Sequence, residues 1–532
     1  MGKQSKRSTS RSLVTRRGWL ASAAAGGTVL ATTTANHGQS SSRPRSLAGM
    51  NVVMFLTDQQ RATMHFPPGW EQRNLPGITR LKRYGVSFDN ACTNACMCSP
   101  ARSTWMSGYF PAQHGVKYTL EEDMSPPENP QVVLPLPDQM RNIATVMAAA
   151  GYQVVYKGKW HVSKPAGAEW APSDVGKYGF NRWDPPDAGA NEDLDQGGGG
   201  DADNDGRFMD DDGPWPLGQE GALTYINNVA SAQQPFFLVV SLVNPHDVLM
   251  YPNNYQVAGY DNTWLLGDIH VPLTYNEDLS SKPQAQRQFL AISSIGLGLL
   301  SSRAMKRDYL NFYGNLIKAS DNYLVQILDA LQAKGLFENT LLIQTSDHGE
   351  MGLAHGGLRQ KMYNFYEETL RVPLVYSNPR LYSKPARCQA MVSHVDFLPT
   401  LASLFNAPAS ARSNWQGVDY SSLVLNPAGP PVQDYLAFTY DDFQNGEPVG
   451  PYPTPPNHIV SIREARYKFA EYYDVDGNVA SEYEMYDRLH DPLEVRNLTA
   501  PGVRRTPAQQ RQYERLLAKL QVVKHTRLRP PS

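Results

Sequence analysis

Four short apolar runs, each followed at once by polar residues, constrain the fold of this chain more than any other feature of its sequence. They occupy residues 51–57, 153–156, 236–243 and 340–345. Continuous apolar runs of this length are typical of strands that are buried on both faces by covering helices. Helical patterns lie between them, such as the stripe of Leu324, Ile327, Leu328 and Leu331 that precedes Gly335.

This alternation predicts an α/β fold with a mostly parallel central sheet flanked by helices. Parallel sheets bind ligands outside the carboxyl ends of their strands. The polar clusters that follow the four runs are therefore expected to share one site. These clusters contain Asp58-Gln59, Lys159-Trp160-His161, Asn244-Pro245-His246 and Asp347-His348.

The composition changes after about residue 405. Segments rich in proline and glycine, 426–432 and 445–457, surround short strand-like runs at 459–463 and 467–472. An amphipathic stretch follows, from about residue 507 to 523. We therefore expect a catalytic domain over residues 49–405 and a smaller C-terminal α+β subdomain over residues 406–532.

Residues 1–48 are interpreted as a signal peptide and linker. Arg16-Arg17 precedes a weakly apolar segment rich in alanine, glycine and threonine, as in bacterial twin-arginine export signals. Because glycines and threonines interrupt that segment, no permanent membrane anchor is expected. The predicted partner is the twin-arginine export machinery, and the mature protein would be periplasmic or secreted. A disordered basic tail is the alternative.

Charge and cysteine content exclude several classes of protein. The chain has 49 basic and 51 acidic residues, a balance that does not indicate a nucleic-acid-binding surface. Its four cysteines are too few for a disulfide scaffold. The spacing of Cys92, Cys96 and Cys98 fits no common zinc site.

An acidic, glycine-rich segment covers residues 187–213. Asp201 to Asp212 match the ligand spacing of an EF-hand loop. The flanking residues do not show two helical patterns, so we expect a solvated loop instead of a second metal site.

The segment that carries the chemistry begins with Cys98-Ser99-Pro100-Ala101-Arg102. It resembles the C-x-P-x-R signature of type I sulfatases, within the alkaline phosphatase superfamily, and the resemblance extends from residue 51 to about residue 497. In that family the cysteine is converted to formylglycine by a formylglycine-generating enzyme. The resemblance therefore implies an alkaline-phosphatase-like sandwich and a sulfuric ester hydrolase that releases an alcohol or phenol and sulfate.

The resemblance also implies a role for each site residue. One divalent metal ion would be held by Asp58, Gln59, residue 98, Asp347 and His348. Lys159 and Lys361 would supply positive charge to the sulfate group and the leaving oxygen. His161 would act as the base, His246 would protonate the leaving group, and Arg102 would anchor the turn that holds residue 98. We expect a helix to begin over residues 102–107, beside the nucleophile.

The modified nucleophile explains how sulfate is released. A serine would form a stable sulfate ester that water attacks slowly. A hydrated formylglycine carries two hydroxyls on one carbon. One hydroxyl attacks sulfur and expels the alcohol, which leaves the sulfate on residue 98. Loss of a proton from the other hydroxyl then restores the aldehyde and ejects sulfate.

Two departures from the family pattern leave alternatives open. Asp58-Gln59 stands where many sulfatases have two aspartates, and His348 stands where many have asparagine. Calcium remains the expected metal, with manganese as the alternative. The same residues also occur in the related phosphonate monoester and phosphodiester hydrolases, which form the alternative function. A non-catalytic protein that binds sulfated ligands is a third alternative, although it would require a degraded site. The substrate, a sulfated small molecule or saccharide, is not specified by the sequence.

Overall fold

The structure is a computed structural model that describes residues 46–120, 134–190, 193–211, 213, 219–229, 234–447 and 449–529. The expected export signal lies outside the described residues. None of the described helices combines the length and the apolar composition that are needed to cross a bilayer.

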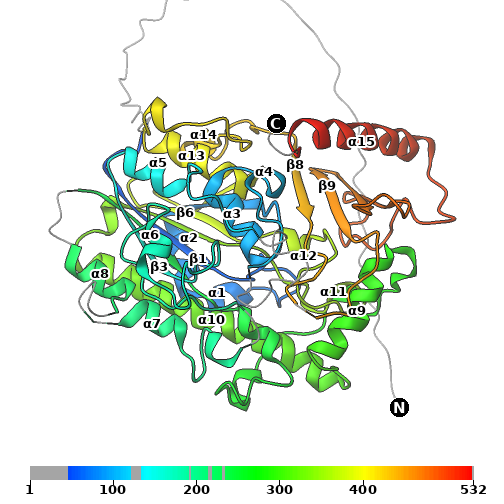
Figure 1. The fold of residues 1–532 in the computed structure, drawn as a ribbon, viewed down its shortest axis with the longest axis horizontal. Coiled ribbons are helices and arrows are strands. Elements are labelled where there is room, and N and C mark those ends of the chain that lie inside the picture. The colour runs from blue at the N-terminus through cyan, green and yellow to red at the C-terminus, as the bar shows by residue number, and fades with distance from the viewer. Residues whose placement is uncertain are drawn as a thin grey trace, which may run out of the picture. The chain divides into compact units, whose positions relative to one another are not determined.

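A seven-stranded sheet forms the centre of the fold (Figure 1). Its strands lie in the order β3-β4-β1-β5-β6-β2-β7. β6 runs antiparallel to both of its neighbours, and the other adjacent pairs are parallel. The mostly parallel sheet predicted from the sequence is therefore confirmed. The strands are β1 (Asn51–Thr57), β2 (Gly85–Cys92), β3 (Gln153–Gly158), β4 (Phe236–Ser241), β5 (Thr340–Ser346), β6 (Leu374–Ser377) and β7 (Ala386–Ser393).

The four strands that precede the polar clusters are adjacent and end together. Gly158 of β3 pairs with Ser241 of β4, which in turn pairs with Leu56 of β1. Thr57 of β1 pairs with Ser346 of β5. Because β3, β4, β1 and β5 are parallel, their carboxyl ends meet at one edge of the sheet. The residues that follow them are thereby brought to one place.

Helices cover both faces of this sheet (Figure 1). Alternate residues of β1 enter different cores: Val52 packs on one side of the sheet and Val53 on the other, as the pleat requires. The first core includes α3 (Cys98–Ser107), α5 (Ile143–Ala149) and α13 (Phe397–Leu404). The second includes α2 (Pro76–Arg83), α8 (Ala222–Val229) and α10 (Arg303–Ala333).

The predicted helical stripe lies in α10. Leu324, Ile327, Leu328 and Leu331 are at most 1% exposed. Gly335, just beyond the end of the helix, has a φ of +67°, which suits a C-terminal glycine cap. This prediction is confirmed.

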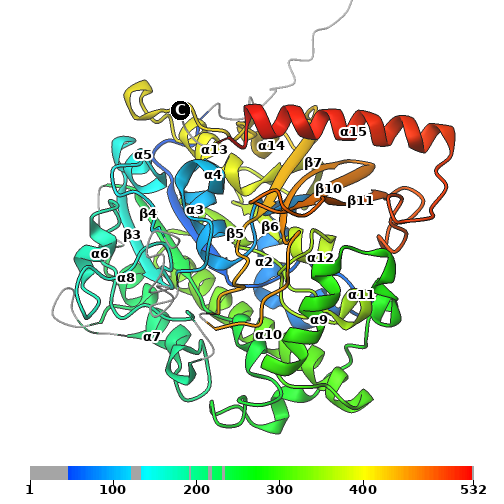
Figure 2. The ribbon, with the colours of Figure 1, turned by 45° about the vertical axis from the view of Figure 1, so that its right-hand side comes forward.

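A second, antiparallel sheet lies in the C-terminal part of the chain, in the order β11-β10-β9-β8. Leu516, Leu520 and Val523 of the last helix pack into a core beneath this sheet, and Figure 2 shows that helix lying across it. The expected α+β character is present, and the boundary at residue 405 stays a prediction. The elements are β8 (Tyr435–Tyr440), β9 (His458–Glu464), β10 (Tyr467–Tyr473), β11 (Glu482–Asp487) and α15 (Pro507–Thr526).

The acidic segment differs from expectation. A helix, α7 (Asn204–Asp210), forms where an EF-hand would need its loop. Asp205 is buried and accepts hydrogen bonds from the backbone N–H groups of Val243, at 2.6 Å, and Asn244, at 3.0 Å. The expectation of a solvated loop is therefore wrong over residues 204–210, because Asp205 binds the backbone beside β4. Asp212 lies outside the described residues.

Candidate active site

Four side chains from distant parts of the chain converge at the carboxyl edge of the sheet. Asp58 follows β1, Asp347 and His348 follow β5, and Cys98 is the first residue of α3. One ligand atom from each lies within 4.8 Å of all the others, and all four residues are buried. Two carboxylates, an imidazole and the residue-98 side chain form a donor set that fits a divalent cation such as calcium or manganese.

Cys98 begins α3, four residues earlier than the sequence predicted. Its Sγ lies 3.4 Å from Nε2 of His348, 3.6 Å from Oδ1 of Asp58 and 3.7 Å from Nζ of Lys159. Burial, reinforced by the negative charge of Asp58, raises the pKa of the Cys98 thiol to about 12. At neutral pH the unmodified side chain is thus a protonated thiol, which is a poor nucleophile.

Arg102 of α3 forms hydrogen bonds with residues at the carboxyl ends of β1, β3, β4 and β5. Its guanidinium donates to Oδ2 of Asp347 and to Oδ2 of Asp58, each over 3.0 Å. It also donates to the carbonyl of Lys159, at 2.9 Å, and to Oγ of Ser241, at 2.8 Å. The residue is fully buried. Arg102 therefore fixes the two carboxylates as well as the turn that holds residue 98.

The two carboxylates experience different electrostatic environments. Burial opposes ionisation of Asp58, but the positive charges of Lys159 and Arg102 hold its pKa well below the usual value. Burial, followed by the negative charge of Asp58, raises the pKa of Asp347 to about 7. Two carboxyl groups around one guanidinium repel each other, so a cation bound between them would favour the ionised form of both.

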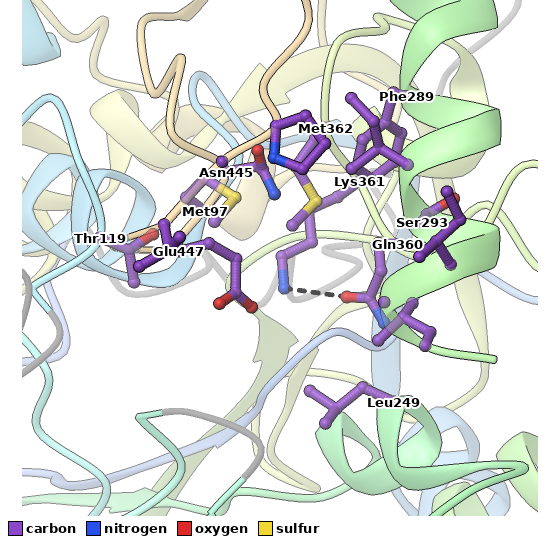
Figure 3. A pocket seen from close by; sticks show the side chains of 18 of the residues that line it. Met97, Thr119, Leu249, Phe289, Ser293, Gln360, Lys361, Met362, Asn445 and Glu447 are labelled. Carbon is purple, nitrogen blue, oxygen red and sulfur yellow. Dashed lines mark hydrogen bonds between the residues drawn. The ribbon is translucent and has the colours of Figure 1, made fainter.

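Gln59 lies beside this group with both ends of its amide engaged. Its Nε2 donates to Oε2 of Glu350, at 2.7 Å, and to Oε1 of Gln360, at 3.1 Å. Its Oε1 accepts a hydrogen bond of 2.6 Å from Nζ of Lys361. Lys361 also reaches Gln360, as Figure 3 shows. Glu350, which no sequence motif indicated as a site residue, therefore orients a predicted metal ligand.

Lys159 and His161 lie in a turn that another unassigned residue supports. Nζ of Lys159 lies 2.7 Å from Oδ2 of Asp58 and also donates to the carbonyl of Gly189. The backbone N–H groups of Trp160 and His161 each donate to a carboxylate oxygen of Asp187, at 2.7 Å. Asp187 comes from a distant loop whose sequence contains no pattern that would predict this contact.

Both predicted catalytic histidines are buried and neutral. Burial, followed by the positive charge of Lys159, lowers the pKa of His161 and of His246 well below 6.5. His246 begins a short 3-10 turn after β4. The carboxylate of the adjacent Asp247 accepts hydrogen bonds from the backbone N–H groups of Gly198 and Gly199, at 3.1 and 3.0 Å, which supports this turn.

A cavity of about 350 Å³ is lined by Cys98, and Figure 3 shows Gln360 and Lys361 among the side chains that surround it. His246, Gln360 and Lys361 line its inner end together with Cys98. Its volume lies in the range of sites that enclose small organic ligands. The structure thus brings the predicted catalytic and metal-binding residues to one edge of the sheet, with a cavity that leads to them.

Two family models match the chain over overlapping stretches. The model described as Sulfatase matches residues 50–407, which is more than half of the chain. The model described as N-sulphoglucosamine sulphohydrolase, C-terminal, matches residues 355–523.

Individual proteins agree with these matches. An ulvan-active sulfatase from Formosa agariphila is 26% identical over 450 residues, covering 84% of this chain and 76% of that protein. A protein solved in complex with its substrate D-glucosamine-2-N,6-O-disulfate superposes with a TM-score of 0.64 at 19% identity, covering 90% and 97% of the two chains. The phosphonate monoester hydrolase of Agrobacterium radiobacter gives a TM-score of 0.60 at 19% identity, covering 89% and 95%. At these identities the two solved structures establish a shared fold.

Proposed function

Because this chain belongs to the sulfatase family and is a sulfuric ester hydrolase, we propose that residue 98, once its cysteine is converted to formylglycine, attacks the sulfur of the ester. The observation that carries this proposal is the convergence of Asp58, Cys98, Asp347 and His348 within 4.8 Å. The first residue of α3 also suits an anionic nucleophile, because the backbone N–H groups of a helix N-terminus favour negative charge.

The metal-binding residues of the proposal are Asp58, Gln59, residue 98, Asp347 and His348. When bound, a divalent ion would polarise the sulfuryl oxygens and favour the ionised nucleophile. Calcium is the first choice because Asp58, Gln59 and Asp347 offer oxygen ligands. Manganese is the alternative because His348 offers a nitrogen ligand.

Two lysines bind the charged part of the substrate. Nζ of Lys159 lies 3.7 Å from Sγ of Cys98, and Lys361 lines the cavity beside Cys98. Their positive charge neutralises the sulfate group and the negative charge that develops on the leaving oxygen. Arg102 holds both aspartates and keeps residue 98 in register with the strand ends.

The two histidines move protons. His161 is neutral, so it can accept the proton whose loss from residue 98 ejects sulfate. His246 lies in the cavity wall, where the leaving group would sit. Because its pKa is lowered, we expect it to gain its proton together with the anionic substrate, which favours the charged imidazole.

Maturation follows from the burial of the nucleophile. Cys98 is 2% exposed, so we propose that a formylglycine-generating enzyme modifies it before the chain folds. Twin-arginine export carries folded proteins, which is consistent with modification before export to the periplasm or the medium.

The test measures sulfate release from an aryl sulfate by metal-loaded protein, beside hydrolysis of a phosphonate monoester and a phosphodiester. Peptide mass spectrometry first establishes the fraction of formylglycine at position 98. We expect the sulfate ester to be hydrolysed with the highest kcat/KM. A higher kcat/KM for the phosphonate monoester would reassign the activity to that class. Loss of all three activities in fully modified protein would contradict catalysis at this site.

A further inference from the structure

The cavity above Cys98 has one wall that is built almost entirely from apolar side chains. Phe289, Ile292 and Ile295 project into the cavity from successive turns of α9 (Gln284–Gly296). Leu249 and Met362 extend this wall towards the inner end, and Figure 3 shows Leu249, Phe289 and Met362 around the cavity. The wall therefore begins beside the proposed reaction centre and continues outwards.

The opposite wall carries the polar groups and one acidic side chain. Thr119, Asn445 and Glu447 line it, and Figure 3 shows the Glu447 carboxylate on the Lys361 side of the cavity. Among the described lining residues, the basic side chains are those of Lys361 and His246, at the inner end. Both are already assigned to the sulfate group and the leaving oxygen, so none of the described lining residues offers the outer cavity a basic side chain for a second anionic group.

The rim of the cavity is also apolar. Ile295 on α9 is 81% exposed, and Val449 on the facing loop is 79% exposed. Apolar side chains gathered at the mouth of a cavity are typical of a site that binds an apolar ligand. The inner part of the wall is rigid, because Phe289 is buried against the ring of Tyr363, with 5.3 Å between the ring centroids.

We propose that this cavity binds the organic part of a singly charged sulfate ester whose body is an uncharged hydrocarbon, aliphatic or aromatic. Esters with a second anionic group, including sulfated saccharides that carry a carboxylate or another sulfate, are disfavoured. This inference rests on the proposed function, because it places the sulfate group at residue 98.

Two physical effects produce the selectivity. A second anion would lose water against Phe289 and Ile292 and would lie near the carboxylate of Glu447, without a basic partner. The hydroxyls of a saccharide would face the same apolar wall and lose hydrogen bonds to water that the wall cannot replace. A hydrocarbon body instead gains from leaving water there.

The test uses two esters that differ only in a remote substituent. They are 4-propylphenyl sulfate and 4-(2-carboxyethyl)phenyl sulfate, with glucose 6-sulfate as the saccharide. For the metal-loaded enzyme we expect kcat/KM for the propyl ester to exceed that for the carboxyethyl ester at least about tenfold. The double variant Ile292→Asn/Ile295→Asn should reduce this ratio, and Glu447→Gln should raise the relative kcat/KM of the carboxyethyl ester.

Leu299→Asn is the matched control. Leu299 is 66% exposed and does not line the cavity, so this variant should leave the ratio unchanged. Equal kcat/KM values for the two aryl esters, or a preference for the saccharide, would overturn the inference and leave the sulfatase activity intact.

Calorimetric binding of the aryl esters to metal-loaded Cys98→Ala separates the inference from the proposed function. Suppose that modified wild-type protein releases no sulfate, but Cys98→Ala still binds the propyl ester at least about tenfold more tightly than the carboxyethyl ester. The catalytic proposal then fails and the cavity assignment stands. If Cys98→Ala binds both esters equally, the cavity assignment fails whatever the turnover.

Discussion

Gln59 donates a hydrogen bond from Nε2 to Oε2 of Glu350 over 2.7 Å, and this contact decides which end of its amide faces the active site. Glu350 is itself fixed by the hydroxyl of Tyr309, at 2.6 Å, and by the backbone N–H of Gln360, at 3.0 Å. Unlike a carboxylate, an amide has one donor end and one acceptor end. A glutamine at this position therefore needs a partner that turns its oxygen towards the metal-binding residues.

Glu350→Gln is expected to weaken metal binding about 10- to 100-fold, the usual effect of losing a contact that orients a ligand. The new amide can donate to Oε1 of Gln59, so it no longer enforces the orientation of that side chain. Isothermal titration calorimetry on the metal-free protein measures the change. The double variant Gln59→Glu/Glu350→Gln should recover part of the affinity, because a carboxylate offers an oxygen in either orientation. Unchanged affinity in Glu350→Gln would show that Gln59 is not a ligand.

Lys361→Ala should leave the metal bound and lower kcat/KM by about 10²- to 10³-fold, because it removes charge stabilisation of the transition state. In the wild type, Nζ of Lys361 donates a hydrogen bond of 2.6 Å to Oε1 of Gln59. The alanine variant loses this hydrogen bond, so Oε1 of Gln59 becomes available to the metal. Asp347→Ala is the contrasting variant and should lose metal and activity together. Metal content by mass spectrometry, measured beside kinetics, compares the two. Equal metal loss in both would remove Lys361 from the substrate-binding group.

Activity should rise in proportion to the fraction of formylglycine at position 98. The unmodified thiol is protonated at neutral pH, because burial and the charge of Asp58 raise its pKa to about 12. Expression with and without a formylglycine-generating enzyme varies the modified fraction, and peptide mass spectrometry measures it. Cys98→Ala is the inactive control. A preparation that contains only the thiol yet hydrolyses sulfate esters at full rate would reject the mechanism.

The sequence predicted the positions of the site residues better than the interactions that hold them. Asp58 and Asp347 could be placed together because each follows a buried run, and parallel strands align their carboxyl ends. Cys98 could be assigned to the same edge only through the resemblance of its motif, because residues 85–92, which form the preceding strand β2, are not a continuous apolar run. The start of α3 was predicted four residues late, because Cys98-Ser99-Pro100 contains no strong capping signal.

The supporting residues could not be predicted for a different reason. Glu350 stands in the polar cluster after β5, but only the packed structure shows that its carboxylate turns towards Gln59. Asp187 binds the backbone of residues 160 and 161 from a loop 27 and 26 residues away in sequence. Asp205 was assigned to a solvated loop, because acidic, glycine-rich composition indicates exposure and cannot reveal backbone donors beside β4.

Arg102→Lys should lower the free energy of unfolding by about 3–5 kcal/mol in metal-free protein. A lysine cannot reproduce the fork that reaches Asp58 and Asp347 together, and one buried carboxylate would lose its partner. Urea unfolding followed by circular dichroism measures the loss. Added calcium should restore part of the stability, because a bound cation neutralises the same carboxylates. A loss below about 1 kcal/mol would show that Arg102 has no such structural role.

His355 should make the protein less stable as the pH rises above neutrality. Burial alone would lower its pKa, but the carboxylates of Glu368 and Glu277 raise it from 6.5 to about 9. Nδ1 of His355 lies 2.7 Å from Oε2 of Glu277, and its ring stacks on Tyr366. Because the folded pKa exceeds the unfolded one, the stabilisation is complete below about pH 6.5 and is lost as the pH rises through about 9.

The expected size of this effect is at most about 3 kcal/mol between pH 6 and pH 9.5. His355→Gln removes the titrating group, so its free energy of unfolding should fall less steeply than that of the wild type over this range. His525→Gln, an exposed position on α15, is the matched control and should keep the wild-type slope. Urea unfolding at several pH values measures all three proteins. If the free energies of unfolding of the wild type and His355→Gln fall in parallel with pH, the imidazole of His355 is not protonated beside Glu277 and Glu368.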